Sequence, residues 1–410
     1  MAEQWKLHVD AGADNDPLFV GIGELPTGKF PDRGFIEALT KVAILALKDA
    51  GMVPRDIDTI LLIPNLHSGA DQADLVFSRM VEELGIHGSC KSSYMVHSGG
   101  STSDNAVRSA HGLIAAGHAH NVLVLQCERW GSADLNEMIT MLSKNGIPGE
   151  WELPTGIQFN AIGAMITNRY MHASGSTPAE MASICVTLRN WANLNDNAMF
   201  RDKPLTVEQI LASRMVCDPL HAFECPPMAD GACAFVMTST EEAKRRGIGH
   251  GVRVAGSGGC VSHYCLSQEV DQAVLGWPVA AERAWNQSGW GPGDADIAQI
   301  YDSYAAVTAI ALEGLGIAEK GEGARWFAAG HGDPGGKLPM NTNGGLLSAG
   351  HTGVGGGTAL LVEGIRQLLH RAPAKRQVKG CERAIIGGSG GSYMDAQILL
   401  LERVGVGAGQ

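Results

Sequence analysis

The sequence predicts an α/β protein whose mostly parallel sheet is covered by helices on both faces. Short apolar runs bounded by Gly or Pro alternate with longer segments that repeat apolar residues at helical spacing. The two halves also share a pattern, a strand followed by a Gly-Gly turn, at Gly99-Gly100 and at Gly387-Gly388. Alternation of this kind favours parallel strands joined by crossover helices.

The first half of the chain begins with strands and helices in regular alternation. A helix is expected from Phe35 to Ala50, ended by Gly51, because its apolar residues recur at helical spacing. A second helix follows the turn at His97–Ser101, with Thr102 or Ser103 as its N-cap, and ends near Gly117. The strands expected in this half are 18–22, 57–63, 94–96, 122–125 and, after an insertion, a strand that ends at 236.

The alternation breaks down between Glu128 and about Pro227, which indicates a less regular insertion containing a helix at 178–192. The second half then resumes the pattern. Its expected strands begin at 252, 297, 383 and 396, and its expected helices end at 315 and 369. We therefore divide the chain into residues 1–249, with the insertion at about 128–227, and residues 250–410.

Composition excludes several classes of function. The chain has 410 residues, 45% hydrophobic and 18% charged, which is ordinary for a globular protein. Its net charge of −12 argues against nucleic acid or an anionic membrane as the main partner. The start, Met1–Lys6, has no apolar signal core, and no segment approaches the roughly 18 uninterrupted apolar residues of a membrane span.

The nine cysteines are scattered, which indicates reduced thiols in the cytoplasm. Cys217, His221 and Cys225 have a spacing that could hold a metal ion, but the prolines around them indicate a connecting loop. We expect no metal site.

A run of glycines between Asn341 and Gly357 surrounds a single histidine, His351. Glycine at this density lets the backbone approach a ligand closely and take φ > 0. The run then passes into a segment with helical spacing. We expect His351 to sit on a glycine-lined turn that leads into a helix.

This run resembles the thiolase motif N-x-x-G-G-x-x-x-x-G-H. Every fixed position matches, with Asn341, Gly344, Gly345, Gly350 and His351. The segment that contains Asp230-Gly-Ala also resembles a signature of the sterol-carrier-protein-type branch. The resemblance implies the thiolase fold, in which two duplicated βαβαβαββ halves form an α-β-α-β-α sandwich and a loop domain covers the site. It implies an acyl-CoA substrate, a homodimer and, as in many relatives, a small zinc-ribbon and OB-fold subunit.

One feature of the family is missing. Thiolases carry a nucleophilic Cys at the start of the helix after the third strand, where the helix N-terminus lowers the thiol pKa. Counting back from the end of that helix places this position at Gly100, and the second family Cys falls at Gly388. Ser98, Ser101 and Ser103 lie around the first position, as a replacement nucleophile or as capping residues.

Thiol-less members of this branch are similar to aldolases that cleave β-hydroxyacyl-CoA. The turn Tyr301-Asp-Ser-Tyr304 stands where the family has a site-lining turn, and aldolase-like members carry a Tyr-Asp-Ser-Phe version. We therefore predict a retro-aldol lyase in which Tyr301 deprotonates the β-hydroxyl. His351, with Asn341, would hold the thioester enolate oxygen.

Several further residues complete the predicted site. We expect Gly100, Ser101, Gly388, His97 and Tyr393 around the substrate. Coenzyme A would enter only as part of the substrate, with no cofactor bound covalently. Because some such lyases are expected to carry Tyr where this chain has His351, an acyltransferase or thiolase acting on a β-ketoacyl-CoA stays open. So does a noncatalytic CoA-binding scaffold subunit.

Overall fold

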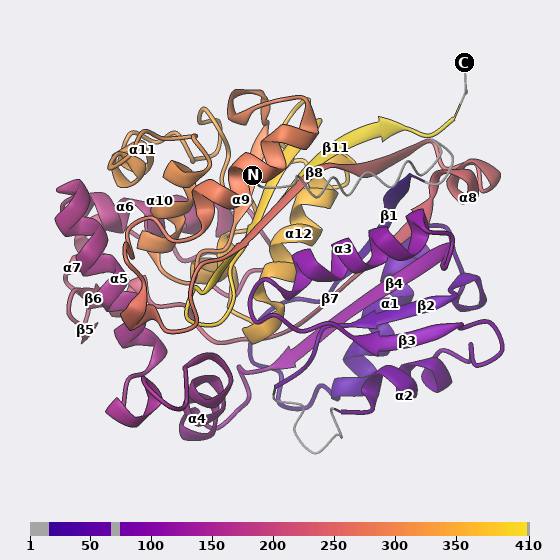
Figure 1. The fold of residues 1–410 in the computed structure, drawn as a ribbon, viewed down its shortest axis with the longest axis horizontal. Helices are drawn as coiled ribbons and strands as arrows, with labels where there is room; N and C mark the ends of the chain where they lie inside the picture. Colours follow the sequence, from indigo (N-terminus) through magenta and orange to yellow (C-terminus); the bar gives the residue numbers. More distant parts are fainter. Residues whose placement is uncertain (1–15, 67–73, 408–410) are drawn as a thin grey trace, which may run out of the picture.

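The computed structural model describes residues 16–66 and 74–407 (Figure 1). The stretch Met1–Lys6, discussed above as the start of the chain, lies outside these residues. The strands are β1 Pro17–Glu24, β2 Thr59–Leu62, β3 Ser92–Met95, β4 Asn121–Arg129, β5 Met215–Cys217, β6 Leu220–His221, β7 Asp230–Ser239, β8 His250–Val261, β9 Ile297–Ile300, β10 Arg383–Gly388 and β11 Asp395–Gly405. The α-helices are α1 Phe35–Asp49, α2 Val76–Glu83, α3 Thr102–Ala115, α4 Leu135–Gly146, α5 Phe159–Ser174, α6 Pro178–Ala192, α7 Val207–Leu211, α8 Thr240–Arg245, α9 Trp277–Ser288, α10 Ala305–Gly314, α11 Gly323–Ala328 and α12 Gly356–Leu368.

Nine of these strands form one sheet, in the order β3-β2-β4-β7-β1-β8-β11-β10-β9. The α/β class is confirmed, but the prediction of a mostly parallel sheet was wrong. Only β2–β3, β2–β4 and β9–β10 pair in parallel among the described strands, and the other five neighbouring pairs are antiparallel. The connection from β10 to β11, residues 389–394, is too short for a parallel crossover.

The helices lie in layers around this sheet. One apolar core joins α3 and α12 to strands of both halves, for example Val107 of α3 and Leu361 of α12 to Phe235 of β7 and Ile386 of β10. A second core packs α1 and α2 against β1, β2 and β4, and a third packs α9 and α10 against β9–β11. Figure 1 shows α3 and α12 near the middle of the molecule. Helices α3 and α12 thus lie between the two halves of the sheet, α1 and α2 cover the outer face of one half, and α9 and α10 cover the outer face of the other.

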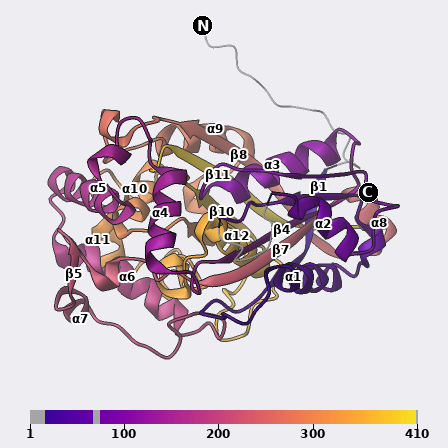
Figure 2. The ribbon, with the colours of Figure 1, turned by 90° about the horizontal axis from the view of Figure 1, so that it is seen from below.

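The helices α4 to α7 and the hairpin β5–β6 all lie within the predicted insertion. In Figure 1 α4 stands at the lower edge of the molecule, and in Figure 2 it faces the viewer. The division at residues 249 and 250 stays a prediction. Within the described residues no helix is long and apolar enough to cross a membrane.

Candidate functional site

A cavity of about 600 Å³ lies where the turns after several strands meet the insertion. The turn after β3 contributes Gly99 and Gly100, and the turn after β9 contributes Tyr301. The glycine run contributes His351. Segments distant in sequence thus surround one space, as expected for the crevice at the ends of strands in an α/β fold.

Two backbone hydrogen bonds fix His351 beside the segment that leads into β7. The His351 N–H donates to the carbonyl of Pro227 at 2.8 Å, and the Ala229 N–H donates to the carbonyl of His351 at 2.9 Å. Tyr301 is held in the same way, because its N–H donates to the carbonyl of Gly387 at 2.8 Å. Neither side chain depends on a flexible loop for its position.

The two side chains form one hydrogen-bonded pair. The Tyr301 hydroxyl lies 3.1 Å from Nε2 of His351, and the two rings meet edge to face. Gly353 N–H donates to Nδ1 of His351 at 3.0 Å, so in the neutral ring the proton is on Nε2. Nε2–H therefore donates to the Tyr301 oxygen, and the phenolic proton is left for the cavity.

Burial keeps both groups neutral. It lowers the pKa of His351 to about 4, so the ring is an uncharged donor at neutral pH. Burial, with the carboxyl groups of Asp302 and Asp395, raises the pKa of Tyr301 above its ordinary value. The single neutral N–H donor of His351 does not offset this effect of burial on the pKa of Tyr301.

Gly100 touches this pair directly. A Cβ atom at position 100 would collide with the carbonyl oxygen of Ser389 and lie 2.7 Å from the Tyr301 ring. Real Cβ atoms do not approach so closely, so the ring fills the space into which a side chain at this position would project.

The sequence of this chain is similar to those of known proteins. Residues 258–403 match the family described as thiolase C-terminal domain-like. The chain is 30% identical to an acetyl-CoA acetyltransferase of Methanothermobacter thermautotrophicus. The similar region spans 390 residues and covers 92% of this chain and 97% of that protein. It is 31% identical over 381 residues to the 17-hydroxy-3-oxo-4-pregnene-20-carboxyl-CoA lyase of Mycobacterium tuberculosis, covering 90% and 94%. The chain belongs to the thiolase superfamily.

A solved structure extends this likeness to the fold. The aldolase described as Ltp2-ChsH2(DUF35) superposes with a TM-score of 0.80 at 25% identity, covering 94% of this chain and 98% of that one. The chain is thus a sterol-carrier-type thiolase-like protein of the lyase kind.

The structure brings five of the eight predicted site residues to the cavity. These are His97, Gly100, Tyr301, His351 and Tyr393. Burial lowers the pKa of His97, so it too favours the neutral form.

Asn341 does not reach the cavity, although it belongs to the thiolase motif. Its Oδ1 accepts from the Ile300 N–H at 2.7 Å, and its Nδ2 donates to the Ile300 carbonyl at 2.8 Å. Both polar groups of the amide are therefore used on the last residue of β9, next to Tyr301. The prediction that Asn341 helps to hold a substrate oxygen is corrected: it holds the end of the strand that carries Tyr301.

Ser101 and Gly388 also lie away from the cavity lining. The Ser101 hydroxyl donates to the carboxylate of Asp395 at 2.7 Å and is fully buried. Ser101, and not Thr102 or Ser103, is the N-cap position of α3, and it makes no side-chain cap bond. A Cβ at Gly388 would collide with the Asp104 carboxylate, so this glycine serves packing between β10 and α3.

Three features of the cavity were not predicted. Ser303 lines it, as does Cys225, whose pKa burial raises to about 12, which makes its thiol a poor nucleophile. The third is a wall formed by one face of α4, with Leu135, Met138, Ile139 and Leu142. The helical spacing of these four residues was visible in the sequence.

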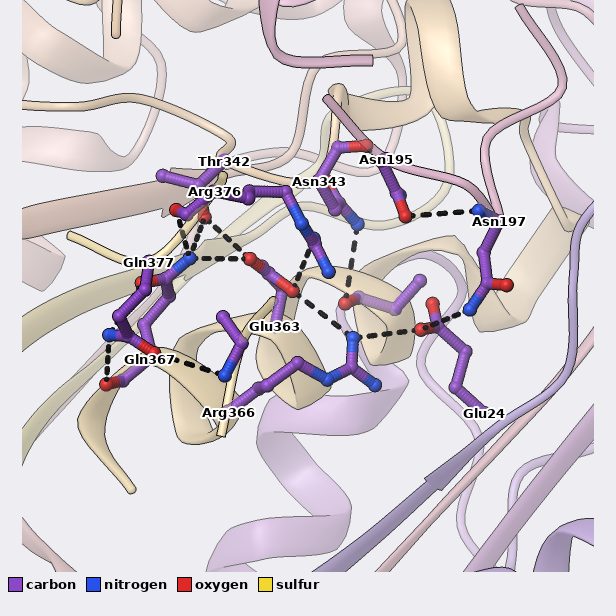
Figure 3. Close-up of polar contacts among 12 residues, drawn as sticks. Glu24, Asn195, Asn197, Thr342, Asn343, Glu363, Arg366, Gln367, Arg376 and Gln377 are labelled. Atoms are coloured by element: carbon purple, nitrogen blue, oxygen red, sulfur yellow. Dashed lines mark hydrogen bonds and ion pairs between the residues drawn. The ribbon is translucent and has the colours of Figure 1, made fainter. Parts of the chain in front are cut away.

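A buried charge network contacts the start of the glycine run through Thr342 (Figure 3). Glu363 of α12 is fully buried and pairs with Arg376 at 2.7 Å and Arg366 at 3.2 Å. Burial raises the pKa of Glu363, but the two guanidinium groups outweigh it and hold the pKa below its ordinary value. The Thr342 hydroxyl donates to Glu363 at 2.8 Å, which ties the Asn341 turn to α12.

Asp302 supports the same run through its backbone. Its carboxylate accepts hydrogen bonds from the backbone N–H groups of Leu346 and Leu347, at 2.9 and 3.2 Å. These residues lie in a single π-helical turn, Gly345–Ala349, within the thiolase motif. Asp302 therefore orients the glycine run, which agrees with a positioning role beside Tyr301.

The described residues contain no group of three His, Cys, Asp or Glu side chains that could hold a metal ion. His221, considered above as a ligand, instead contacts Glu224 at 3.1 Å.

Proposed function

We propose that this protein is a carbon–carbon lyase that cleaves a β-hydroxyacyl-CoA by retro-aldol chemistry, without a cysteine nucleophile. The observation that carries the proposal is the position of the Tyr301 ring, 2.7 Å from where a side chain at Gly100 would begin. The site holds a buried phenol that is hydrogen-bonded to His351 and packs beside Gly100, the position at which the family resemblance leads us to expect the thiol. The likeness to a mycobacterial CoA-ester lyase supports the same reaction class.

The protonation states indicate how Tyr301 acts. Burial disfavours a free phenolate, so a step that leaves Tyr301 charged is costly. A phenol that takes the β-hydroxyl proton while it gives its own proton to the α-carbon stays neutral throughout. The β-hydroxyl O–H and the Cα–Cβ bond break, the Cβ=O bond and a Cα–H bond form, and the products are a carbonyl compound and a shortened acyl-CoA.

His351 assists this exchange without changing its charge. Its Nε2–H donates to the Tyr301 oxygen, which gains negative character as its proton departs. Asn341 and Asp302 act through position only, by fixing β9 and the glycine run around the pair.

The acyl group is expected to be apolar. The four α4 side chains that line the cavity are all aliphatic or Met, and Leu135 is 62% exposed in the free protein. An apolar acyl group bound there would remove this surface from water. The steroid-like group named for the mycobacterial relative is one candidate.

Lys29, an exposed cation among the lining residues, supports binding of the CoA phosphates.

We also propose a cytoplasmic homodimer, with a zinc-ribbon and OB-fold protein as a possible further subunit. The open edge of the sheet supports a dimer, because Tyr94 and Met95 of the edge strand β3 are each 36% exposed. The similar aldolase whose name joins Ltp2 to ChsH2(DUF35) supports a second kind of subunit.

The deciding experiment is incubation with a series of CoA esters followed by mass analysis of the products. A lyase converts β-hydroxyacyl-CoA to a shorter acyl-CoA and a carbonyl compound without added CoA. The acyltransferase alternative, favoured by retention of His351 and by the archaeal relative, requires a β-ketoacyl-CoA together with free CoA. A scaffold subunit converts neither the β-hydroxyacyl-CoA nor the β-ketoacyl-CoA. If no ester of the series were converted at saturating concentration, the lyase proposal would be wrong.

A further inference from the structure

The proposed cleavage requires polar groups at two substrate oxygens, the β-hydroxyl and the thioester carbonyl. The Tyr301–His351 pair offers the cavity a single free proton, because Nε2–H is already donated to Tyr301. That pair can therefore serve one oxygen. The oxygen of the thioester enolate needs a donor from elsewhere.

A second hydroxyl pair lines the same cavity. The hydroxyl groups of Ser303 and Tyr393 lie 2.6 Å apart, and both residues are buried, at 5% and 3% exposure. Either oxygen can be the donor in this contact. Whichever group donates, the proton of the other hydroxyl remains for a ligand in the cavity, since within the described residues neither has another hydrogen bond.

The backbone at Tyr393 indicates that this placement is not incidental. Tyr393 has φ of +62°, a left-handed conformation that an aromatic residue rarely adopts. The turn is held on both sides: the Ser392 hydroxyl donates to the Gly146 carbonyl at 2.6 Å, and Met394 N–H donates to the Gly390 carbonyl at 3.1 Å. Strained residues that are held so firmly are concentrated at functional sites.

We propose that Ser303 and Tyr393 form the site for the thioester oxygen and stabilise the enolate by hydrogen bonding. Ser303 comes from the same turn as Tyr301, two residues later, and Tyr393 reaches in from the connection between β10 and β11. The two pairs then divide the reaction: Tyr301 and His351 exchange protons at the β-hydroxyl and α-carbon, while Ser303 and Tyr393 hold the carbonyl oxygen. This assignment rests on the proposed function and replaces His351 and Asn341 at that oxygen.

The neutral state of Tyr393 suits this task. Burial raises the pKa of Tyr393 well above its ordinary value, so its hydroxyl stays a donor at neutral pH. A neutral donor strengthens its hydrogen bond as charge develops on the enolate oxygen, which favours the transition state over the bound ester.

The test compares two probes that differ only in the carbonyl oxygen, an acyl-CoA thioester and the matching S-alkyl-CoA thioether. Wild-type protein should bind the thioester more tightly, and Tyr393→Phe and Ser303→Ala should each reduce that preference by roughly tenfold. The double variant should lose little more, because one hydroxyl donates to the other and the pair offers the ligand a single proton. Tyr304→Phe is the matched control, since its hydroxyl donates to Asn160 at 2.8 Å and not to this pair.

A second measurement follows the enolate itself. Exchange of the α-protons of an acyl-CoA in D₂O should slow by roughly 10²–10³-fold in Tyr393→Phe, the usual effect of removing one oxyanion donor. An unchanged thioester preference in both single variants would overturn the assignment. The thioester-to-thioether ratio needs no cleavage, so failure of the lyase proposal and failure of this one are distinguished.

Discussion

Replacement of Tyr301 by Phe is the most direct test of the proposed chemistry. The change removes only the hydroxyl, because the ring keeps its packing against Gly100. Lost with it are the 3.1 Å hydrogen bond to His351 and the group that exchanges protons with substrate. Removal of one acid–base group costs roughly 10²–10⁴-fold in rate, which is about 3–5 kcal/mol. Affinity for a saturated acyl-CoA, which has no β-hydroxyl, should stay near that of the wild type.

His351→Ala provides the second arm of this experiment. Loss of the Nε2–H donor should slow cleavage by roughly 10²–10³-fold, about 3–4 kcal/mol. Because His351 acts through the Tyr301 oxygen, the double variant should be little slower than Tyr301→Phe alone. Single-turnover cleavage of a β-hydroxyacyl-CoA gives all three rates, and calorimetry with the saturated ester gives the affinities.

Two results would refute this reasoning. Unimpaired cleavage by Tyr301→Phe would show that the phenol only packs, and the proton exchange would then belong to His97 or Tyr393. Fully additive losses in the double variant would show that His351 acts on the substrate independently of Tyr301, as first expected from the thiolase motif.

Four further predictions follow from the structure. Intact-protein mass after mixing with acyl-CoA should show no thiol adduct, since burial raises the pKa of Cys225, the cysteine at the cavity, to about 12; an adduct on any Cys would restore the thiolase mechanism. Cleavage should persist as the pH falls from 7 and be lost only near pH 4, where His351 gains a proton; a midpoint near the ordinary ~6.5 would contradict its neutral, buried state. Burial raises the pKa of the Asp104 carboxyl from 3.8 in the unfolded chain to about 7 in the folded protein. The contribution of Asp104 to stability is therefore fully present below pH 3.8 and is lost as the pH rises through 7. In denaturant unfolding, the free energy of unfolding of Asp104→Asn should rise relative to that of the wild type by up to about 4 kcal/mol between pH 4 and 8. Light scattering should give a dimer at micromolar concentration, and a particle of only 43 kDa would contradict the proposed use of the β3 edge.

Local chemistry made part of this site predictable. The glycine run and the histidine within it follow from residue type and spacing, whereas Tyr301 was assigned to the site from the resemblance of its turn to that of the thiolase family. The structure brings Tyr301 and His351 within hydrogen-bonding distance, as a shared site requires. Gly100, chosen by counting back along the helix that follows it, lines the cavity just before α3, and its match to the family Cys stays a prediction.

The residues that were misplaced depend on partners far away in the chain. Asn341 has φ of +48° and its amide faces β9, which no pattern within the run indicates. Ser101 was assigned to the site from its position beside Gly100, but its hydroxyl bonds Asp395, 294 residues later. The direction of strand pairing failed for a similar reason, since alternation with helices does not reveal that β7 and β8 both run antiparallel to β1.

The contact between Gly100 and Tyr301 also bears on whether the chain is a catalyst or a scaffold. A scaffold that had only lost its thiol would not need another functional group beside position 100, and any small residue could occupy that position. Here the glycine is required, because any Cβ would collide with the Ser389 carbonyl and crowd the Tyr301 ring. Tyr301 as a whole is buried, and burial of its hydroxyl costs free energy unless the group is hydrogen-bonded. His351 supplies one hydrogen bond, and the phenolic proton still faces the cavity. A donor kept buried beside a cavity is explained by a ligand oxygen, and only turnover distinguishes a catalyst from a scaffold that binds CoA.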